Sequence, residues 1–296
     1  MVNVQAVLFV YLAVGVFCRK KNIISDQSTQ SFVNFLINVT LPCMVFHSFS
    51  VDLTLSQLAS AGAVLAAATA ICAFSYLLSK LLYRRCPDDE RAIMSYGTLV
   101  NNCGFAGLPM IASTFSAEVT FFASIYIIPT RIAMWSAGIS MFTQTPLREK
   151  IRKVMLNPGI VSCELGILRM LLSIDLPPVL NTAIYNIGEC TVPMSMIVVG
   201  AILAESGWRG VFEKNVLYLT AVRLVMIPLL VLAALRLIGF DAELLPSIVL
   251  LVAMPVGVTT AILAQRYGAN TTFASKCVLV STMLSFLTVP LLTLLL

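Results

Sequence analysis

The feature that most constrains this chain is a pair of backbone breaks inside apolar stretches long enough to cross a lipid bilayer. The first, Asn102-Cys103-Gly104-Phe105-Ala106-Gly107-Leu108-Pro109, lies within an apolar run over about residues 92–115. The second, Met254-Pro255-Val256-Gly257, interrupts a run over about 244–264. Proline removes a backbone donor and clashes with the preceding turn, so such a break persists in lipid only against protein or a water-filled cavity.

Composition places both breaks in a membrane. The chain is 59% hydrophobic and 11% charged, and no water-soluble domain of this size could bury that much apolar surface. The formal net charge is +5, but the basic residues lie in short loops, so they predict membrane topology and not a nucleic-acid partner. The eight cysteines show no CxxC spacing and there is one histidine, so we predict no metal site and no cofactor.

Hydropathy predicts an all-α polytopic membrane protein with ten transmembrane helices. Their approximate ranges are 4–18, 31–50, 57–83, 92–115, 119–142, 158–174, 179–204, 213–238, 244–264 and 271–295. Lysine and arginine gather in the loops after helices one, three, five, seven and nine, and the other loops carry only acidic charges. Positive loops face the cytoplasm, so we expect a multi-pass protein of the cytoplasmic (inner) membrane with both termini extracytoplasmic.

The chain also divides into two similar halves. A basic connecting loop, predicted as cytoplasmic over 144–157, separates a first five-helix repeat at 1–143 from a second at 158–296. Pro42 and Pro109 in the first half have counterparts at similar separation, Pro193 and Pro255, in the second. Because each repeat has an odd number of helices, the two repeats would be inverted relative to one another. The alternative is that membrane helices are simply richer in proline.

Several motifs in order resemble the auxin efflux carrier family in its shorter, prokaryotic form, over essentially the whole chain. They are Val39-Thr40-Leu41-Pro42, the stretch from Asn102 to Pro109, Leu156-Asn157-Pro158, Val192-Pro193-Met194-Ser195 and Ala253-Met254-Pro255-Val256. The resemblance implies the fold of the bile acid–sodium symporters, with helices 4 and 9 broken at prolines and crossing at mid-membrane. It also implies scaffold and transport domains, each built from both repeats, and the carriage of organic anions.

Where two broken helices cross, free backbone groups and half-helix N-termini can hold a carboxylate. The predicted substrate-binding residues are Asn102, Cys103, Gly107, Pro109, Met254, Pro255, Val256, Gly257 and Asn38. The resemblance implies that the Asn102 amide contacts the substrate carboxylate; a hydrogen bond between packed helices is the alternative. Asn38 shares a helix face with Pro42 and either points at the cavity or joins helices.

Three charged residues within the spans are predicted to support the crossing or the coupling. Arg131 and Lys276 follow Pro109 and Pro255 at nearly equal separations, so we expect each to offset half-helix carbonyls; snorkelling to a wet surface is the competing reading. In that role they would take the place of the sodium ions whose binding the resemblance to the bile acid–sodium symporters implies. Glu189 either carries a proton or forms a structural ion pair.

These patterns predict a secondary transporter for a small organic anion, a mono- or dicarboxylate such as malate or malonate or an auxin-like acid, working by an elevator-type alternating-access mechanism. A sodium-coupled symporter of a bile-acid-like or other organic anion is the alternative, and a passive channel is a third class. No metal-protease or nucleophile motif is present, so we predict no enzyme. The expected partners are the anion, the lipid bilayer and, in a homodimer, a second copy. Coupling to protons, to sodium or to neither stays open.

Overall fold

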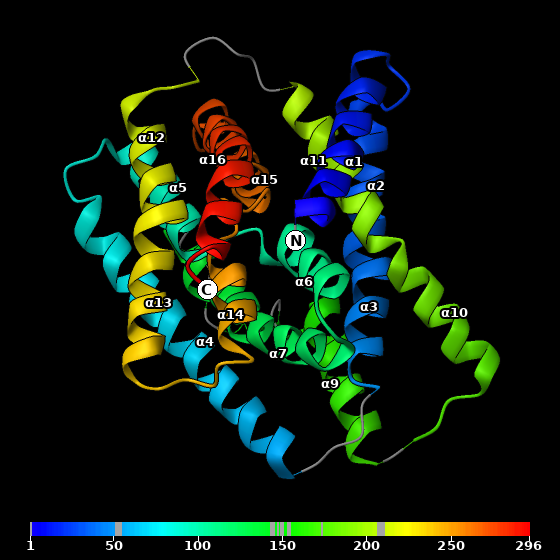
Figure 1. Cartoon of the computed structure of the whole chain (residues 1–296). Coiled ribbons are helices and arrows are strands. Elements are labelled where there is room, and N and C mark those ends of the chain that lie inside the picture. Colours follow the sequence, from blue (N-terminus) through cyan, green and yellow to red (C-terminus); the bar gives the residue numbers. More distant parts are fainter. Residues whose placement is uncertain are drawn as a thin grey trace. The chain divides into compact units, whose positions relative to one another are not determined.

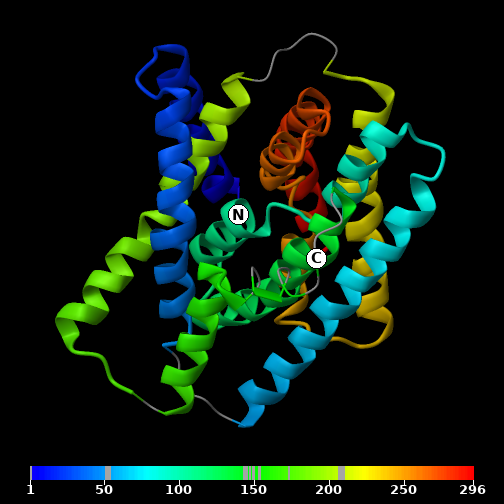
Figure 2. The same ribbon diagram turned by 180° about the vertical axis from the view of Figure 1, so that it is seen from behind.

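The computed structural model describes residues 2–50, 55–142, 146, 148, 151–152, 155–172, 174–205 and 211–296. These residues form helices, and their β structure is confined to an isolated bridge. The chain divides into two compact units (Figures 1 and 2). The first comprises Met1–Ala66, Gly104–Arg131 and Arg152–Glu205, and the second comprises Ala67–Cys103, Ile132–Ile151 and Ser206–Leu296. Residues 144, 145, 147, 149, 150, 153 and 154 of the predicted connecting loop lie outside the described residues.

The first unit is built from helices that lie on both sides of the connecting loop in sequence. Its elements are α1 (Val2–Lys20), α2 (Asp26–Phe35), the π-helical turn η1 (Leu36–Thr40), α3 (Leu41–Ser48), the beginning of α4 (Leu55–Leu82), most of the π-helical turn η2 (Cys103–Gly107), α6 (Leu108–Thr114), most of α7 (Ala117–Ala133), α9 (Pro158–Leu171), α10 (Pro178–Glu189) and α11 (Thr191–Glu205).

Helices α1 and α11 approach one another closely and lie side by side in both views (Figures 1 and 2). A Cβ atom at Gly15 would collide with the backbone of Ile197, and a Cβ atom at Gly200 would collide with the carbonyl of Leu12. Small residues let two helix backbones pack directly in lipid, where helix association depends on close contact and not on the exclusion of water. The two glycines therefore fix the spacing of this pair.

The second unit holds the segments on either side of the second break. Its elements are the remainder of α4, α5 (Asp88–Leu99), the π-helical turn η3 (Met134–Gly138), the 3₁₀ turn η4 (Ile139–Met141), α12 (Lys214–Ala221), the π-helical turn η5 (Val222–Met226), α13 (Ile227–Leu237), α14 (Leu245–Val252), α15 (Thr259–Arg266) and α16 (Thr271–Thr293). Buried Tyr96, Leu99, Val100, Met134 and Leu263 form an apolar cluster within it.

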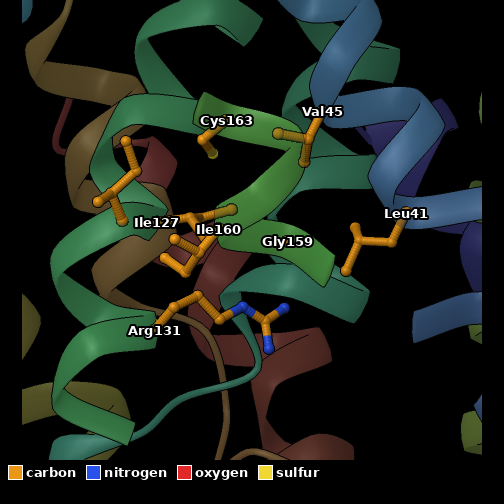
Figure 3. A pocket seen from close by; sticks show the side chains of 8 residues that line it. Leu41, Val45, Ile127, Arg131, Gly159, Ile160 and Cys163 are labelled. Carbon is orange, nitrogen blue, oxygen red and sulfur yellow. The ribbon is translucent and has the colours of Figure 1, made fainter. Parts of the chain in front are cut away.

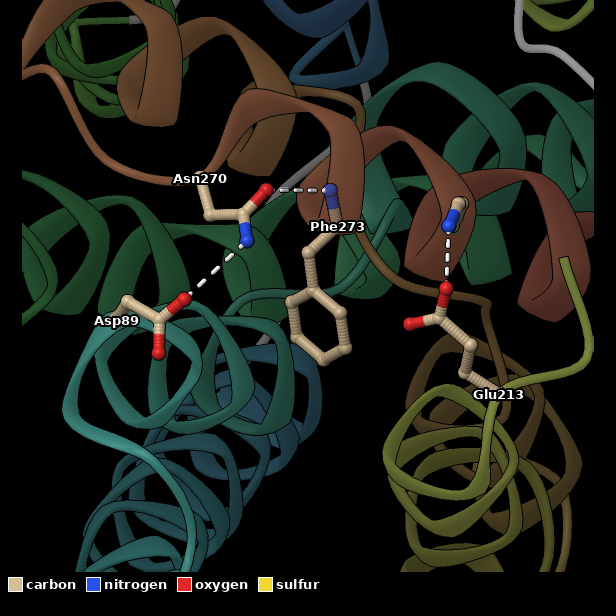
Figure 4. Close-up of polar contacts among 5 residues, drawn as sticks. Asp89, Glu213, Asn270 and Phe273 are labelled. Carbon is tan, nitrogen blue, oxygen red and sulfur yellow. Dashed lines mark hydrogen bonds and ion pairs between the residues drawn. The ribbon is translucent and has the colours of Figure 1, made fainter. Parts of the chain in front are cut away.

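A polar network joins the beginnings of three helices in the second unit (Figure 4). Asn270 caps α16 by accepting the Phe273 N–H at 3.0 Å, and its amide donates to Asp89 in the first turn of α5 at 3.3 Å. Beside them, Lys276 of α16 is paired with Glu213, the residue before α12. These contacts fix the ends of α5, α12 and α16 at one end of the unit.

Many of the helices are long and apolar enough to cross a membrane. Among the described residues six spans meet that criterion: Gln27–Ser48, Gln57–Leu82, Ala117–Gly138, Pro178–Ile202, Lys214–Leu237 and Thr271–Thr293. Their surfaces carry large apolar side chains that the protein leaves uncovered, such as Leu77, Val179 and Leu237, the last two more than 80% exposed. Numerous exposed apolar side chains on helices of this length indicate a surface that lies in lipid. The chain is therefore an all-helical, multi-pass membrane protein.

One of the two helix breaks lies at the predicted proline, and the other lies several residues before it. Near Pro255 the helix does break, because α14 ends at Val252 and α15 begins at Thr259. In the first half, however, the regular helix ends at Leu99, and Pro109 is the second residue of α6. Proline is tolerated there because the first N–H groups of a helix have no partner within it. The break therefore lies at residues 100–102, several residues before Pro109.

Candidate substrate site at the crossing of the broken helices

The unwound segments that follow α5 and α14 cross inside the second unit. Asn101 and Val256 form an isolated antiparallel bridge. The Asn102 N–H donates to the Pro255 carbonyl at 2.8 Å, and the Gly257 N–H donates to the Val100 carbonyl at 3.2 Å. Backbone groups freed by one break are thus satisfied by the other, which meets the requirement for irregular backbone within a membrane protein.

Side chains complete this arrangement. The Asn101 amide donates to the Leu251 carbonyl at 2.6 Å, and the Val256 N–H donates to the Ser281 hydroxyl at 3.1 Å. A Cβ atom at Gly257 would lie 3.2 Å from the Asn101 carbonyl oxygen, so only a residue without a side chain fits there without displacement. The crossing is consequently a tightly held backbone structure.

Asn102 differs from its neighbour because its amide has no partner. The side chain is 3% exposed, and its Nδ2 atom is buried without a hydrogen bond. The hydroxyls of Thr260 and Thr282 are also buried and unsatisfied, and each is close in sequence to a residue that bonds the crossing. A buried donor without an acceptor costs roughly 1–3 kcal/mol, so it marks a place where an acceptor such as a carboxylate oxygen would be stabilised.

A buried arginine that the sequence patterns did not single out for the crossing contacts it directly. Arg223 is 3% exposed, and its guanidinium donates to the carbonyls of Thr98 (3.0 Å), Met254 (3.2 Å) and Val252. Thr98 and Val252 lie at the C-terminal ends of α5 and α14. The acceptors of Arg223 lie about thirty residues or more away in sequence, and no local motif joins them to it.

The predicted substrate-binding residues fall into two groups. Asn102, Cys103, Met254, Pro255, Val256 and Gly257 lie in the second unit and are buried there, and all except Cys103 lie in the unwound segments of the crossing. Gly107 and Pro109 belong to the first unit, where Gly107 ends η2 and Pro109 is the second residue of α6.

Arg131 lies in the first unit at the end of α7. Its guanidinium lies against Gly104, where an added Cβ atom would collide with it. Figure 3 shows the side chain reaching from α7 toward the start of α9, where Gly159 lies. It lines a gap of about 10 Å³, the size of one water, together with Leu41, Val45, Ile127, Ile128, Gly159, Ile160 and Cys163.

Lys276 is placed differently from the expectation. Among the contacts that the structure describes, its ammonium meets the Glu213 carboxylate and no half-helix carbonyl. Lys276 and Arg131 occupy corresponding places in the two halves of the sequence, but their side chains lie in different environments. The guanidinium of Arg223 instead contacts half-helix carbonyls at the crossing, the kind of group that Lys276 was expected to offset.

The remaining predicted residues lie in the first unit, away from any described contact with the crossing. Asn38 is exposed, and its amide donates to the Asn34 carbonyl at 2.7 Å, a bond within its own helix. Glu189 is exposed at the end of α10 and lines a cavity of about 250 Å³ with His47, Ser48, Ser50, Thr120 and Tyr185. Among the described residues, no three His, Cys, Asp or Glu side chains gather to hold a metal.

Comparison with known proteins identifies relatives of this chain and the family to which it belongs. It is 28% identical over 139 residues to a Rhizobium meliloti (strain 1021) protein named "Putative malonate transporter"; this match spans 47% of the chain and 43% of that relative. It is 23% identical over 290 residues to an "Uncharacterized transporter" of Methanothermobacter thermautotrophicus, covering 96% of the chain and 94% of the relative. The family described as "Membrane transport protein" matches residues 2–152 and 144–293. The chain therefore belongs to this auxin efflux carrier-like family of membrane transporters.

Proposed function

We propose that the protein is a secondary transporter that moves a small organic anion, a mono- or dicarboxylate, across the cytoplasmic membrane. The observation that carries this proposal is the unpartnered amide of Asn102, held beside a crossing whose backbone groups are already bonded. An amide donor in this place has an acceptor only when a ligand or water supplies one. Carboxylate oxygens are strong acceptors and suit this position.

The surrounding charge supports an anion. Arg223 places a full positive charge at the ends of α5 and α14, and arginine stays protonated in proteins. The name of the Rhizobium meliloti relative indicates a short dicarboxylate, malonate, for that protein.

We further infer ten membrane spans in two inverted repeats, with the crossing at mid-membrane. In support, each of the ten predicted segments contains helical residues, and each compact unit draws on both halves of the sequence. Units assembled in this way suit an elevator mechanism, in which a transport domain moves against a scaffold. Membership in a transporter family also argues against an enzyme.

Counterflow into proteoliposomes tests the proposal. Purified protein should exchange a radiolabelled mono- or dicarboxylate saturably with its unlabelled form, whereas a passive channel would give a flux that does not saturate. Asn102→Ala should abolish this exchange and retain the wild-type elution profile in detergent. Asn186→Ala, an exposed amide on α10, is the matched control and should exchange at the wild-type rate. Normal affinity and rate in Asn102→Ala would remove Asn102 from the site.

A further inference from the structure

Two helix C-termini meet at one point in the second unit. Thr98 is in the last turn of α5, and Val252 is the last residue of α14. Each helix end carries the equivalent of roughly half a negative charge, because its final carbonyls have no partner within the helix. Secondary transporters commonly use such half-helix ends and unwound carbonyls to coordinate a sodium ion or a proton. The ligand set at this crossing is thus one that suits a cation.

In this chain a side chain already meets those carbonyls. Arg223 donates to Thr98 and Val252 at the two helix ends and to Met254 in the unwound segment. Its guanidinium carries one positive charge, which matches the two half-charges of the helix ends, and it presents several donors in a fixed plane. Unlike a bound ion, it cannot dissociate during a transport cycle.

The local backbone explains how the arginine reaches this point. Arg223 lies in the π-helical turn η5, and the second residue of the next helix is Pro228. A π-helical turn adds one residue to the helical register, and turns of this kind are frequent at functional sites. The turn therefore changes the direction of Arg223 relative to the apolar face that follows it.

From this geometry we propose that Arg223 is a built-in cation at the crossing, which takes the place of a coupling alkali ion and makes anion transport independent of sodium and potassium. This inference rests on the proposed anion transport and adds that the transport is not coupled to an alkali ion. Arg223 acts as a positioning residue: it holds the two helix ends together and cancels their partial negative charge, which would otherwise repel an anion near Asn102.

The test uses counterflow in proteoliposomes with sodium, with potassium or with N-methylglucamine as the cation on both sides. The wild-type rate should be the same in all three. Arg223→Ala should lose activity by roughly 10- to 100-fold, the effect of removing charge-assisted hydrogen bonds, and should regain part of it with millimolar methylguanidinium or sodium. Arg223→Lys should keep more activity than Arg223→Ala, because it retains the charge.

The matched control is Arg236→Ala, in α13 of the same unit. Arg236 also donates to a backbone carbonyl, that of Leu295, but it does so at the exposed surface. It should exchange anions at the wild-type rate in every cation. Strict sodium or potassium dependence of the wild type would overturn the role of Arg223 and leave the transport function standing. Absence of anion exchange in all three buffers would instead refute the transport function, and the inference with it.

Arg223→Ala loses three buried hydrogen bonds, so thermal unfolding of the wild type in detergent provides a second measurement that does not depend on this variant. Sodium should not raise its unfolding temperature, because the carbonyl ligands are already occupied. A saturable rise with sodium would show a free cation site and contradict the inference.

Discussion

At the scale of single residues, Asn101 and Asn102 show how two adjacent identical side chains acquire different roles. Asn101 is fully engaged, since its amide donates to the Leu251 carbonyl and its backbone pairs with Val256. Asn102 uses its backbone N–H on Pro255 and keeps its amide without a partner. The first residue therefore holds the crossing together, and the second is available to a ligand.

This difference predicts opposite consequences for the two alanine variants. Asn101→Ala should lower the free energy of unfolding by about 1 kcal/mol, because it removes the buried hydrogen bond from the Asn101 amide to the Leu251 carbonyl. Asn102→Ala should unfold at the wild-type temperature or slightly above, since it removes an unsatisfied donor, while anion affinity falls. Thermal unfolding in detergent and counterflow, measured on both variants, separate the two roles. Equal destabilisation of both variants would contradict the assignment of different roles to Asn101 and Asn102.

Sequence reasoning found Asn102 because it stands beside glycines and a proline in a membrane-length run, where a break needs an explanation. It placed the break itself wrongly, at Pro109, because a proline in the second position of a new helix is accommodated. It did not assign Arg223 to the crossing, since the three acceptors come from α5, from the end of α14 and from the unwound segment after α14, which only the folded chain brings together. For Lys276, symmetry between the repeats was a poor guide to its partner, Glu213.

At the scale of elements, three π-helical turns precede a proline in the same way. The turns η1, η2 and η5 are each followed by a helix whose second residue is proline: Pro42, Pro109 and Pro228. Proline cannot donate to the carbonyl four residues earlier and clashes with it, and a wider turn relieves that clash. The hydropathy pattern predicts the helices but carries no signal for these turns.

Pro228 therefore provides a test of how η5 directs Arg223. Pro228→Ala restores an N–H that can bond the carbonyl of Leu224, so the turn should close into regular α-helix and rotate the preceding residues by about 100°. Counterflow should fall by roughly tenfold, as for a lost charge-assisted hydrogen bond. Pro290→Ala, at a proline inside α16, is the control and should leave the rate unchanged. A wild-type rate in Pro228→Ala would mean that the turn does not position Arg223.

The contact of α1 with α11 predicts a second effect at this scale. Gly200→Val places a side chain against the backbone of Leu12 and should lower the free energy of unfolding by about 1–3 kcal/mol, as overpacking does. Gly62→Val, in α4, meets no atom within 4 Å and serves as the matched control. Unfolding of the two variants in detergent, followed by tryptophan fluorescence, checks the difference. Equal stability would show that α1 and α11 separate at little cost.

At the scale of the whole molecule, the charge pattern of the loops predicts the orientation, and Cys86 can report it. Cys86 follows α4, in a basic loop that we expect in the cytoplasm. In a variant that retains Cys86 alone among the eight cysteines, an impermeant maleimide should label inverted membrane vesicles and leave intact cells unlabelled. Labelling of intact cells would reverse the orientation of every span.

The same thiol predicts a pH dependence of that labelling. Burial raises the pKa of Cys86 above its ordinary value, Glu90 raises it further, and Arg91 opposes them. Since the thiolate is the reactive form, labelling of inverted vesicles near neutral pH should be slower than labelling of free cysteine and should accelerate as the pH rises. Glu90→Gln should increase the rate at neutral pH, because it removes a negative charge that disfavours the thiolate.

The way each unit is assembled from three separate stretches has a consequence for biosynthesis. While the ribosome is still translating the second half, the first unit lacks Arg152–Glu205 and the second lacks Ser206–Leu296. Helices inserted early must remain in the bilayer without the partners that are synthesised later. For example, α1 can pack against α11 only after most of the chain has been made. Halves expressed from separate genes and split at the connecting loop would therefore be incomplete alone, and activity would require both to be synthesised in one membrane.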